Sequence, residues 1–338
     1  MALENPSTGP AAWLRAESPF HPGEQAVQAR AGVRELIDRF ARRAFHDFLS
    51  DQHRRFFASL PFLLLGSLDA ARRPWASILF GRPGFAHSPD PHTLRIDAHA
   101  GFGDRLGADL AVGVPVGLLG IELPTRRRNR LNGIVTAIDG AGFAVSVVQS
   151  FGNCPQYIQA RDPVFAAAPE SVVAPRPVHA EGAVLSPAAT ALIQHADTFF
   201  VATAAPGPGG AGAVEDVDIS HRGGRPGFVR AVQENGATVL TWPDFPGNSY
   251  FNTLGNLTID PRAGLLFIDF ATGDLLSLTG AAEIVWQGAE LAGFAGAERL
   301  LCLRVTEGSF IEHAVPLRWS APEPAPQLAA TGTWDGAR

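Results

Sequence analysis

Lysine is absent from this chain, and all 27 of its basic residues are arginine. Without lysine the protein cannot form a Schiff base with pyridoxal phosphate, and it cannot use the lysine of a P-loop to hold a nucleotide. Any phosphate must therefore be bound by arginine, hydroxyl, amide or backbone N–H groups. A genome-wide preference for arginine codons would explain the absence, but the chemical exclusion holds whatever its cause.

Cysteine is also scarce, since Cys154 and Cys302 are the only two. Two cysteines form neither a disulfide framework nor a zinc site, so we expect no metal and a reducing, cytoplasmic environment. The N-terminal residues lack the charged-then-apolar pattern of a signal peptide. No apolar run approaches the roughly 20 residues of a membrane span. The net charge of −6 gives no reason to expect nucleic-acid binding.

The composition favours a β-rich fold. The 338 residues are 46% hydrophobic, and they include 36 glycines and 27 prolines, which suit short strands and turns better than long helices. Apolar spacing predicts one amphipathic helix over residues 26–45, and Ser50 and Ser186 are expected to cap two further helices. Strands are predicted at 62–68, 75–80, 93–98, 116–122, 132–138, 143–148, 199–203, 216–220, 227–232, 238–242, 264–270, 275–286 and 300–306.

The two halves of the chain read as copies of one plan. The pentapeptide GRPGF occurs at 81–85 and again at 224–228, and LAVGVPVGLLGIEL (110–123) matches LTIDPRAGLLFIDF (257–270). Collinear matches of this kind predict a duplication, although two unrelated β-rich halves of similar composition are the alternative. Duplicated β units usually pack as a pseudo-dimer, which places a ligand groove at their junction.

This repeat predicts five regions along the chain. They are an N-terminal arm and amphipathic helix (1–45), a first half (46–161), a linker (162–183), a second half carrying a phosphate cradle (184–320) and a disordered tail (321–338).

Several segments resemble a known family. They are VDISHRGGRPGFVR (217–230), TVLTWPDFPGNSYFNTLGNLTIDPRAGLLFIDF (238–270) and, in the first half, PFLLLGSLDAARRPWASILFGRPGF (61–85) with SFGNCPQYIQ (150–159). They are similar to the FMN-binding split-barrel family related to pyridoxamine 5'-phosphate oxidase, among its predicted flavin-nucleotide-binding proteins. The resemblance implies a mainly β fold with a few helices, in which tandem FMN-binding split barrels pack as a pseudo-dimer and FMN lies at the interface.

The residues around 245–257, FPGNSYFNTLGNL, form the predicted phosphate cradle. Asn248, Ser249 and Asn252 stand at a helix start, whose free N–H groups and partial positive charge suit a phosphate, although an ordinary helix cap has the same appearance. Close relatives carry arginine after the Gly-Asn pair, where this chain has Ser249 and Tyr250. Of Arg222, Arg225 and Arg230, we expect one or two to contact the cofactor.

The first half lacks this cradle but keeps Gln156 and Tyr157, so we expect one composite site built from both halves. The candidate cofactor-binding residues are Ser220, His221, Arg222, Arg225, Phe228, Val229, Arg230, Asn248, Ser249, Tyr250, Asn252, Gln156 and Tyr157.

Other candidates are weaker. No catalytic acid–base pair is identified, because the carboxylates Glu122, Asp269 and Asp274 stand at strand ends, where such groups are common. For Cys154 we prefer a buried packing role to that of a reactive thiol. For the run TRRRNR (125–130) we prefer a solvated loop to a site that docks an anionic substrate or partner.

The resemblance implies an FMN-dependent oxidoreductase that takes electrons from NAD(P)H or a partner reductase and acts on a small molecule or a redox partner. A flavin-binding module without turnover is one alternative, and a haem-binding protein using His221 or His313 is another. Pyridoxamine-phosphate oxidation itself is not expected. Whether the tandem chain forms a homodimer is left open.

Overall fold

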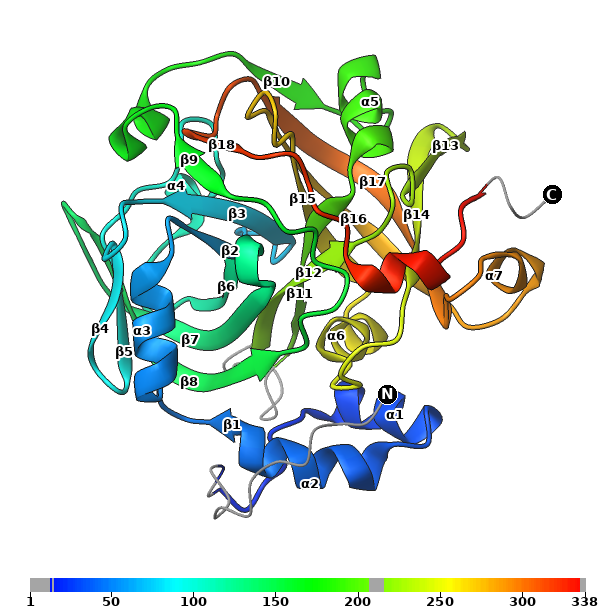
Figure 1. The fold of residues 1–338 in the computed structure, drawn as a ribbon, viewed down its shortest axis with the longest axis horizontal. Coiled ribbons are helices and arrows are strands. Elements are labelled where there is room, and N and C mark those ends of the chain that lie inside the picture. The colour runs from blue at the N-terminus through cyan, green and yellow to red at the C-terminus, as the bar shows by residue number, and fades with distance from the viewer. Residues whose placement is uncertain (1–12, 14, 207–215, 335–338) are drawn as a thin grey trace.

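The computed structural model describes residues 13, 15–206 and 216–334 (Figure 1). Its helices are short and lie mostly at the edges of two large sheets. They are α1 (Pro22–Arg30), α2 (Arg34–Ala44), α3 (Asp51–Ser59), α4 (Leu106–Asp109), α5 (Pro187–His195), α6 (Asn252–Ile259) and α7 (Ala289–Gly293), with short 3-10 turns η1 (Leu123–Thr125), η2 (Pro169–Val173) and η3 (Pro326–Ala330). No helix in these described ranges is long and apolar enough to cross a membrane.

The first sheet is built entirely from antiparallel pairs of the first half. Its order is β3-β2-β6-β7-β8-β5-β4, with β1 added on β8. The strands are β1 (Phe45–His46), β2 (Phe62–Leu68), β3 (Pro74–Phe80), β4 (Ala86–Asp90), β5 (Thr93–Ile96), β6 (Pro115–Glu122), β7 (Arg127–Asp139) and β8 (Gly142–Asn153).

The second sheet repeats this plan strand for strand. Its order is β12-β11-β15-β16-β17-β14-β13, with β10 added on β17. The strands are β10 (Val178–Glu181), β11 (Thr198–Ala205), β12 (Asp216–Gly223), β13 (Arg230–Glu234), β14 (Ala237–Asp244), β15 (Arg262–Ile268), β16 (Leu275–Val285) and β17 (Arg299–Ile311). The prediction of a mainly β fold with a tandem repeat is confirmed. The predicted strands are all present, whereas the short strands β1, β4 and β10 of the two sheets were not predicted.

Local details repeat as well as topology. In the two GRPGF turns, Phe85 N donates to Arg82 O and Phe228 N donates to Arg225 O, each at 2.9 Å. Ser50 and Ser186 cap α3 and α5 as predicted, because each hydroxyl accepts a bond from a first-turn N–H. Strands β7 and β16 also carry a bulge at the same point, after Asn132 and after Thr279.

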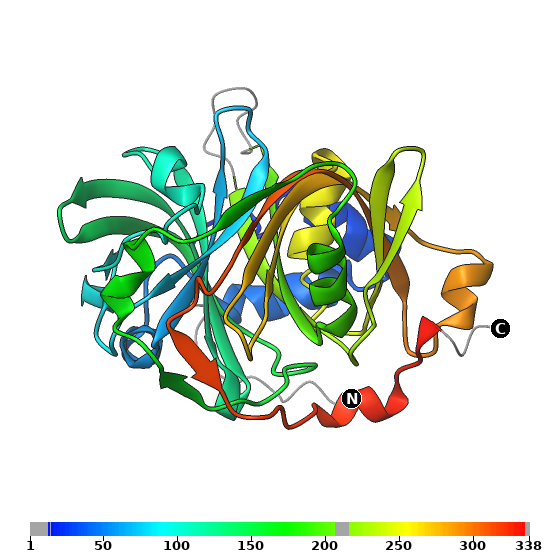
Figure 2. The ribbon, with the colours of Figure 1, turned by 90° about the horizontal axis from the view of Figure 1, so that it is seen from above.

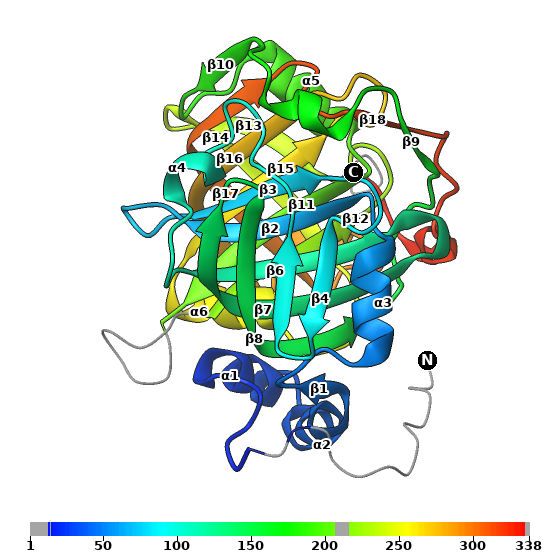
Figure 3. The same cartoon turned by 90° about the vertical axis from the view of Figure 1, so that its left-hand side faces the viewer.

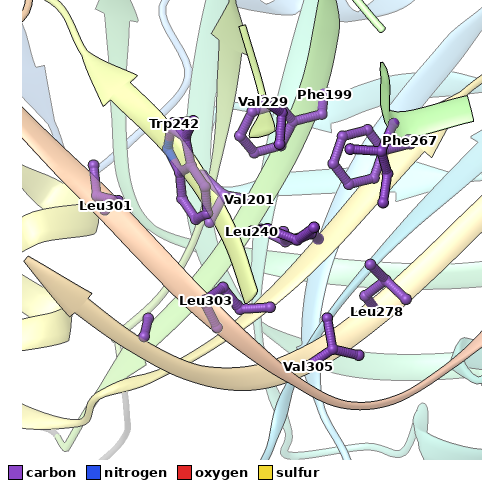
Figure 4. Packing of buried hydrophobic residues seen from close by; sticks show 14 of the residues in the cluster. Phe199, Val201, Val229, Leu240, Trp242, Phe267, Leu278, Leu301, Leu303 and Val305 are labelled. Atoms are coloured by element: carbon purple, nitrogen blue, oxygen red, sulfur yellow. The ribbon is translucent and has the colours of Figure 1, made fainter. Parts of the chain in front are cut away.

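The two halves pack face to face through β2, β3 and β6 on one side and β11, β12 and β15 on the other (Figure 2). A buried cluster made of Leu64, Ile78 and Leu119 with Phe200 and Leu266 joins them. Each half also encloses a core of its own inside its curved sheet, shown for the second half by Phe199, Trp242 and their neighbours in Figure 4. Burying both faces of the central strands in this way makes the halves one folded unit.

The N-terminal segment differs from its prediction. The expected single helix over 26–45 is two helices, α1 and α2, which meet at Gly32, where φ is +71°. Val33, expected to continue the apolar stripe, instead precedes α2. Figure 3 shows both helices below the sheets, where α1 packs against α6. A left-handed glycine ends a helix, so periodicity alone did not reveal the break.

The tail is also ordered where we expected disorder. Residues 321–334 cross both halves (Figure 2): Ala325 N donates to Gln159 Oε1 at 2.8 Å, and Trp334 Nε1 donates to the carbonyl of Phe228 at 2.9 Å. Residues 335–338 lie outside the described residues. Just before the tail, β18 (Leu317–Trp319) pairs with β9 (Pro163–Phe165) from the predicted linker. Backbone bonds to both halves order the tail despite its Pro- and Ala-rich composition.

Candidate functional site

A pocket lies where β7 of the first half meets β12 and the start of α6 in the second half. It is lined by Leu119, Arg128, Arg130, Asn153, Cys154, Gln156 and Tyr157 from the first half, and by Ser220–Gly223, Phe228, 243–249, 251–254, Glu298 and Arg299 from the second. A composite site that combines both halves was the prediction, and the structure brings these segments together.

Two arginines of β7 reach into this pocket because residues two apart on a strand point to the same face. The side chain of Arg130 is 7% exposed, and its Nη1 lies 2.9 Å from Asp218 Oδ1. Arg128 Nε donates to the carbonyl of Cys154 at 2.7 Å, and its Nη1 donates to His221 Nδ1 at 3.2 Å. Burial, with repulsion from Arg130 and Arg222, lowers the pKa of Arg128 to about 10. The arginines that line the pocket therefore outnumber its carboxylates, and the region around Arg128 carries excess positive charge.

A third arginine comes from β12. Arg222 Nη1 lies 2.5 Å from Asp244 Oδ1, and the other oxygen of Asp244 accepts a bond from Arg299 Nε at 3.0 Å. One carboxylate thus orients two guanidinium groups. This arrangement fixes the position of Arg222 without using all of its donors.

Several buried polar atoms around the pocket have no hydrogen-bond partner among the described residues. They are Arg130 Nε, Arg222 Nε, Asn153 Nδ2 and His221 Nε2. His221 is neutral, since burial and three neighbouring arginines hold its pKa well below the usual value. An arginine can only donate, so Nδ1 of His221 accepts and Nε2 carries the proton. All four orphan atoms are therefore donors, which is the complement of an oxyanion.

The start of α6 adds to this donor set. Its N-cap residue, Phe251, lies in the left-handed region at φ +62°, and no side chain caps the helix. Asn252, Thr253 and Leu254 form the first turn and line the pocket. Ser249 (φ +60°) and Tyr157 (φ +62°) are left-handed too. Strained backbone of this kind concentrates at binding sites.

The mouth of the pocket is aromatic. Tyr157 of the first half stacks on Phe245 of the second, with ring centroids 4.9 Å apart and planes inclined by 21°. The pocket has a volume of about 120 Å³. That is below the ~300–1,000 Å³ of sites that bury a whole drug-sized ligand. Its volume therefore suits an anionic group, and any attached ring has to lie at the mouth.

Behind α6, helix α1 completes a buried polar cluster. Glu24 accepts bonds from His21 N at 2.8 Å and from Asn252 Nδ2, and His21 Nε2 lies 2.8 Å from Asn256 Oδ1. Burial, with repulsion from Asp216 and Asp218, raises the pKa of Glu24 well above its usual value. Asn252, predicted to contact the cofactor through its side chain, therefore uses its amide to hold α1. Its backbone stays at the pocket.

The ligand-type atoms of His21, Glu24 and Asp216 lie within 4.8 Å of one another. Both imidazole nitrogens of His21 are already engaged, however, because Nδ1 accepts from Gly23 N at 3.1 Å and Nε2 faces Asn256. Burial, followed by repulsion from Asp218, raises the pKa of Asp216 to about 7. The two carboxyl groups therefore keep their protons to higher pH than usual, and the nitrogens of His21 already have partners within the protein.

Most of the predicted cofactor-binding residues line the pocket: Ser220, His221, Arg222, Phe228, Asn248, Ser249, Asn252, Gln156 and Tyr157. Four predicted residues lie elsewhere. Arg225 donates to the carbonyl of Leu328, Arg230 pairs with Glu290, Val229 belongs to the core, and Tyr250 packs between Phe20 and Phe45.

Sequence reasoning missed Arg128 and Arg130. The run TRRRNR was expected to be a solvated loop, but η1 ends at Thr125 and β7 begins at Arg127, so both side chains belong to a strand that faces the second half. The alternation of Arg128 and Arg130 ahead of Asn132 was the available signal. Asp244 and Arg299 were missed as well.

Other candidates lie outside this pocket. His313 is an exposed turn residue at φ +50°, and its N–H donates to Asp274 at 2.7 Å. Asp269 accepts bonds from the N–H groups of Ala271 and Thr272 in a turn. Cys154 lines the pocket, and its backbone carbonyl accepts a bond from Arg128 Nε.

Comparison with known proteins gives distant structural likenesses. No protein-family profile matches the chain, and no curated protein matches it. HupZ from Group A Streptococcus is similar at 15% identity over 36% of this chain and 90% of its own, with a TM-score of 0.27. HutZ, the heme storage protein of Vibrio cholerae, is similar at 15% identity over 38% of this chain and 95% of its own, with a TM-score of 0.24. What the pocket binds has to be inferred from its own residues.

Proposed function

We propose that this pocket binds FMN, with the phosphate inside the pocket and the ring at its mouth. The observation that carries the proposal is the set of four buried donors without partners, Arg130 Nε, Arg222 Nε, Asn153 Nδ2 and His221 Nε2. A phosphate offers three acceptor oxygens and would satisfy donors that otherwise cost about 1–3 kcal/mol each. The uncapped N–H groups in the first turn of α6 would bind the same phosphate.

The residues at the mouth fit a flat ring. Tyr157 and Phe245 offer aromatic faces on opposite halves, and Pro243 and Phe251 line the same pocket. Their centroid distance of 4.9 Å is too short for a ring to enter between them, so a ring would lie against the pair or displace Tyr157. Tyr157 sits in strained backbone and is the residue suited to move.

An oxidoreductase role follows from the cofactor if it binds. The isoalloxazine supplies the electron transfer, while the protein supplies orientation and charge. The carboxylates at the pocket, Asp244 and Glu298, are both paired with Arg299, and neither stands free as an acid or base. We therefore assign no catalytic residue to the chain. The electron source stays NAD(P)H or a partner reductase, and flavin binding without turnover is the alternative.

Haem is the second candidate, because its propionates would suit the same arginines and His221 is a buried neutral imidazole in the pocket. The bond from Arg128 Nη1 to His221 Nδ1 speaks against iron ligation. It fixes the proton on Nε2, and that nitrogen would have to lose its proton to bind a metal.

The test is titration of the full chain with FMN, riboflavin and haemin, followed by absorbance. We expect FMN to bind at least about 100-fold more tightly than riboflavin, which lacks the phosphate. Arg222→Gln should weaken FMN binding at least about tenfold, since Asp244 keeps Arg299 as a partner and the fold is retained. Arg225→Gln is the matched control, because Arg225 bonds to the tail outside the pocket.

Each other outcome has a meaning. Equal affinity for FMN and riboflavin would show that the pocket is not a phosphate site. A sharp Soret band with haemin, lost in His221→Ala, would favour the haem candidate. A protein that takes up none of the three would refute both candidates.

A further inference from the structure

A second cleft of about 390 Å³ is lined by Arg161, which follows Tyr157 along the chain. It is formed by Arg161, by the end of α5 with Asp197, by the turn after β15 and by the segment that begins at Trp319. Its volume falls within the ~300–1,000 Å³ of small-molecule sites. Four chain segments from both halves and the tail meet here, and nothing in the function proposed above uses this cleft.

Two residues that line the cleft, Arg161 and Asp197, form an ion pair in which each side chain keeps an unpaired atom. Arg161 Nη2 lies 2.5 Å from Asp197 Oδ2, and the two side chains are 6% and 8% exposed. Arg161 Nη1 and Asp197 Oδ1 are buried and have no partner among the described residues. An unpaired donor therefore lies on the same ion pair as an unpaired acceptor. Burying such atoms without partners costs about 1–3 kcal/mol each, so a native structure needs a reason to keep them.

The walls of the cleft are aromatic. The Phe270 ring lies 4.2 Å from Arg161 Cζ on one side and meets Trp319 edge-on at 5.0 Å. Leu192 and Ile268 add apolar surface. Trp319 Nε1 is a third buried polar atom without a partner among the described residues, and it can only donate.

We propose that this cleft binds a small, neutral aromatic carboxamide. The amide oxygen would accept from Arg161 Nη1 or Trp319 Nε1, its N–H would donate to Asp197 Oδ1, and its ring would lie among Phe270, Leu192 and Ile268. A primary amide carries a donor and an acceptor on one edge, which is the pattern that the unpaired atoms present. This inference does not depend on what the first pocket binds.

Charge excludes the nearest chemical relatives of such a ligand. Asp197 balances Arg161, and His195 and Asp269 also line the cleft. A carboxylate has no N–H to donate to Asp197 Oδ1 and would place a second negative charge beside it, so it would bind more weakly than an amide. A cation would find the Phe270 face already covered by the guanidinium of Arg161. A ketone of the same shape would accept from the donors but leave Asp197 Oδ1 unpaired.

The experiment uses the full chain and three probes of one size: benzamide, benzoate and acetophenone. Affinity is measured by calorimetry, and ligand NMR confirms the contact. We expect saturable binding of benzamide, with benzoate and acetophenone each at least about tenfold weaker, since one lost hydrogen bond in a buried site is worth about that factor.

Variants locate the site. Trp319→Phe keeps the packing and removes one donor, so benzamide should bind at least about fivefold more weakly. Trp334→Phe is the matched control, because Trp334 donates to Phe228 O and does not line the cleft. Asp197→Asn should reduce the preference for benzamide over acetophenone. If that variant fails to fold, because Arg161 is left unpaired, the probe series and Trp319→Phe decide the question.

Three results would overturn the proposal. They are no saturable binding of benzamide at millimolar concentration, benzoate binding as tightly as benzamide, or affinity unchanged in Trp319→Phe.

Discussion

The two halves place the same register positions at the interface but fill them with opposite chemistry. On β7 these positions hold Arg128 and Arg130, and the matching positions of β16 hold Leu275 and Ser277. On β12 the interface position holds His221, where β3 has Ile78. The duplication created two equivalent places, and in this structure one is a charged pocket while the other belongs to the apolar interface.

The packing, by contrast, is symmetrical. A Cβ added at Gly117 would lie 2.4 Å from Val217 O, and one added at the matching Gly264 would lie 2.4 Å from Pro74 O. Backbone of each half thus approaches backbone of the other at the same point. The comparison teaches that packing of the pseudo-dimer requires the same close backbone contact from both halves. The polar residues suited to a ligand are needed at only one of the two equivalent places.

The largest effect should come from breaking the buried ion pair of the polar side. Arg130→Met leaves Asp218 buried without its cation, and we expect a loss of about 3–5 kcal/mol in the free energy of unfolding. Ser277→Ala at the matching position should cost less than about 1 kcal/mol. Denaturant unfolding of both variants measures the difference. Equal losses of unfolding free energy in the two variants would contradict the claim that only one side of the interface depends on a buried ion pair.

The symmetrical contact can be broken from either side. Gly117→Ala and Gly264→Ala should each lower the free energy of unfolding by about 1–3 kcal/mol, because the added methyl meets backbone that cannot move aside. Gly140→Ala is the control, since nothing lies within 4 Å of its added Cβ. Should one variant of the pair be neutral, the halves do not share the contact.

A smaller effect depends on pH and concerns two carboxyl groups of the polar side. Glu24 and Asp216 have raised pKa values, Asp216 to about 7, whereas both ionise near pH 4 in an unfolded chain. These two groups therefore bind more protons in the folded protein than in the unfolded chain between about pH 4 and 7. The stability that they contribute is fully present below that window and falls as pH rises through it, by about 1.4 kcal/mol per pH unit for each proton.

Asp216→Asn removes one of these protons, so the slope of unfolding free energy against pH should become shallower. Asp162→Asn, an exposed position, should leave the slope unchanged. A slope that Asp216→Asn leaves unchanged would contradict the raised pKa of Asp216.

Much of the fold was predictable because it depends on local sequence patterns. Alternating apolar residues predicted the long strands, and two serine caps with two GRPGF turns revealed the repeat. Strand β4 was missed because its sequence, AHSPD, is polar and contains proline. It forms by pairing with β5, which only the assembled sheet shows.

Site residues that belong to one continuous motif could be predicted from the sequence. Those that reach the site only when the two halves pack together could not. The 245–257 segment and Gln156 with Tyr157 were found from sequence. Arg128 and Arg130 were taken as solvent-exposed, since nothing local shows that β7 faces the other half. Arg225 and Arg230 were misplaced because their partners, Leu328 and Glu290, are distant in sequence.

The number of FMN molecules bound per chain tests the central claim most directly. Calorimetric titration of the full chain should give one FMN per chain, and Arg222→Gln should weaken that single event. Two equivalent binding events, or one that is unaffected by Arg222→Gln, would contradict the claim that one side of the duplicated interface holds the ligand.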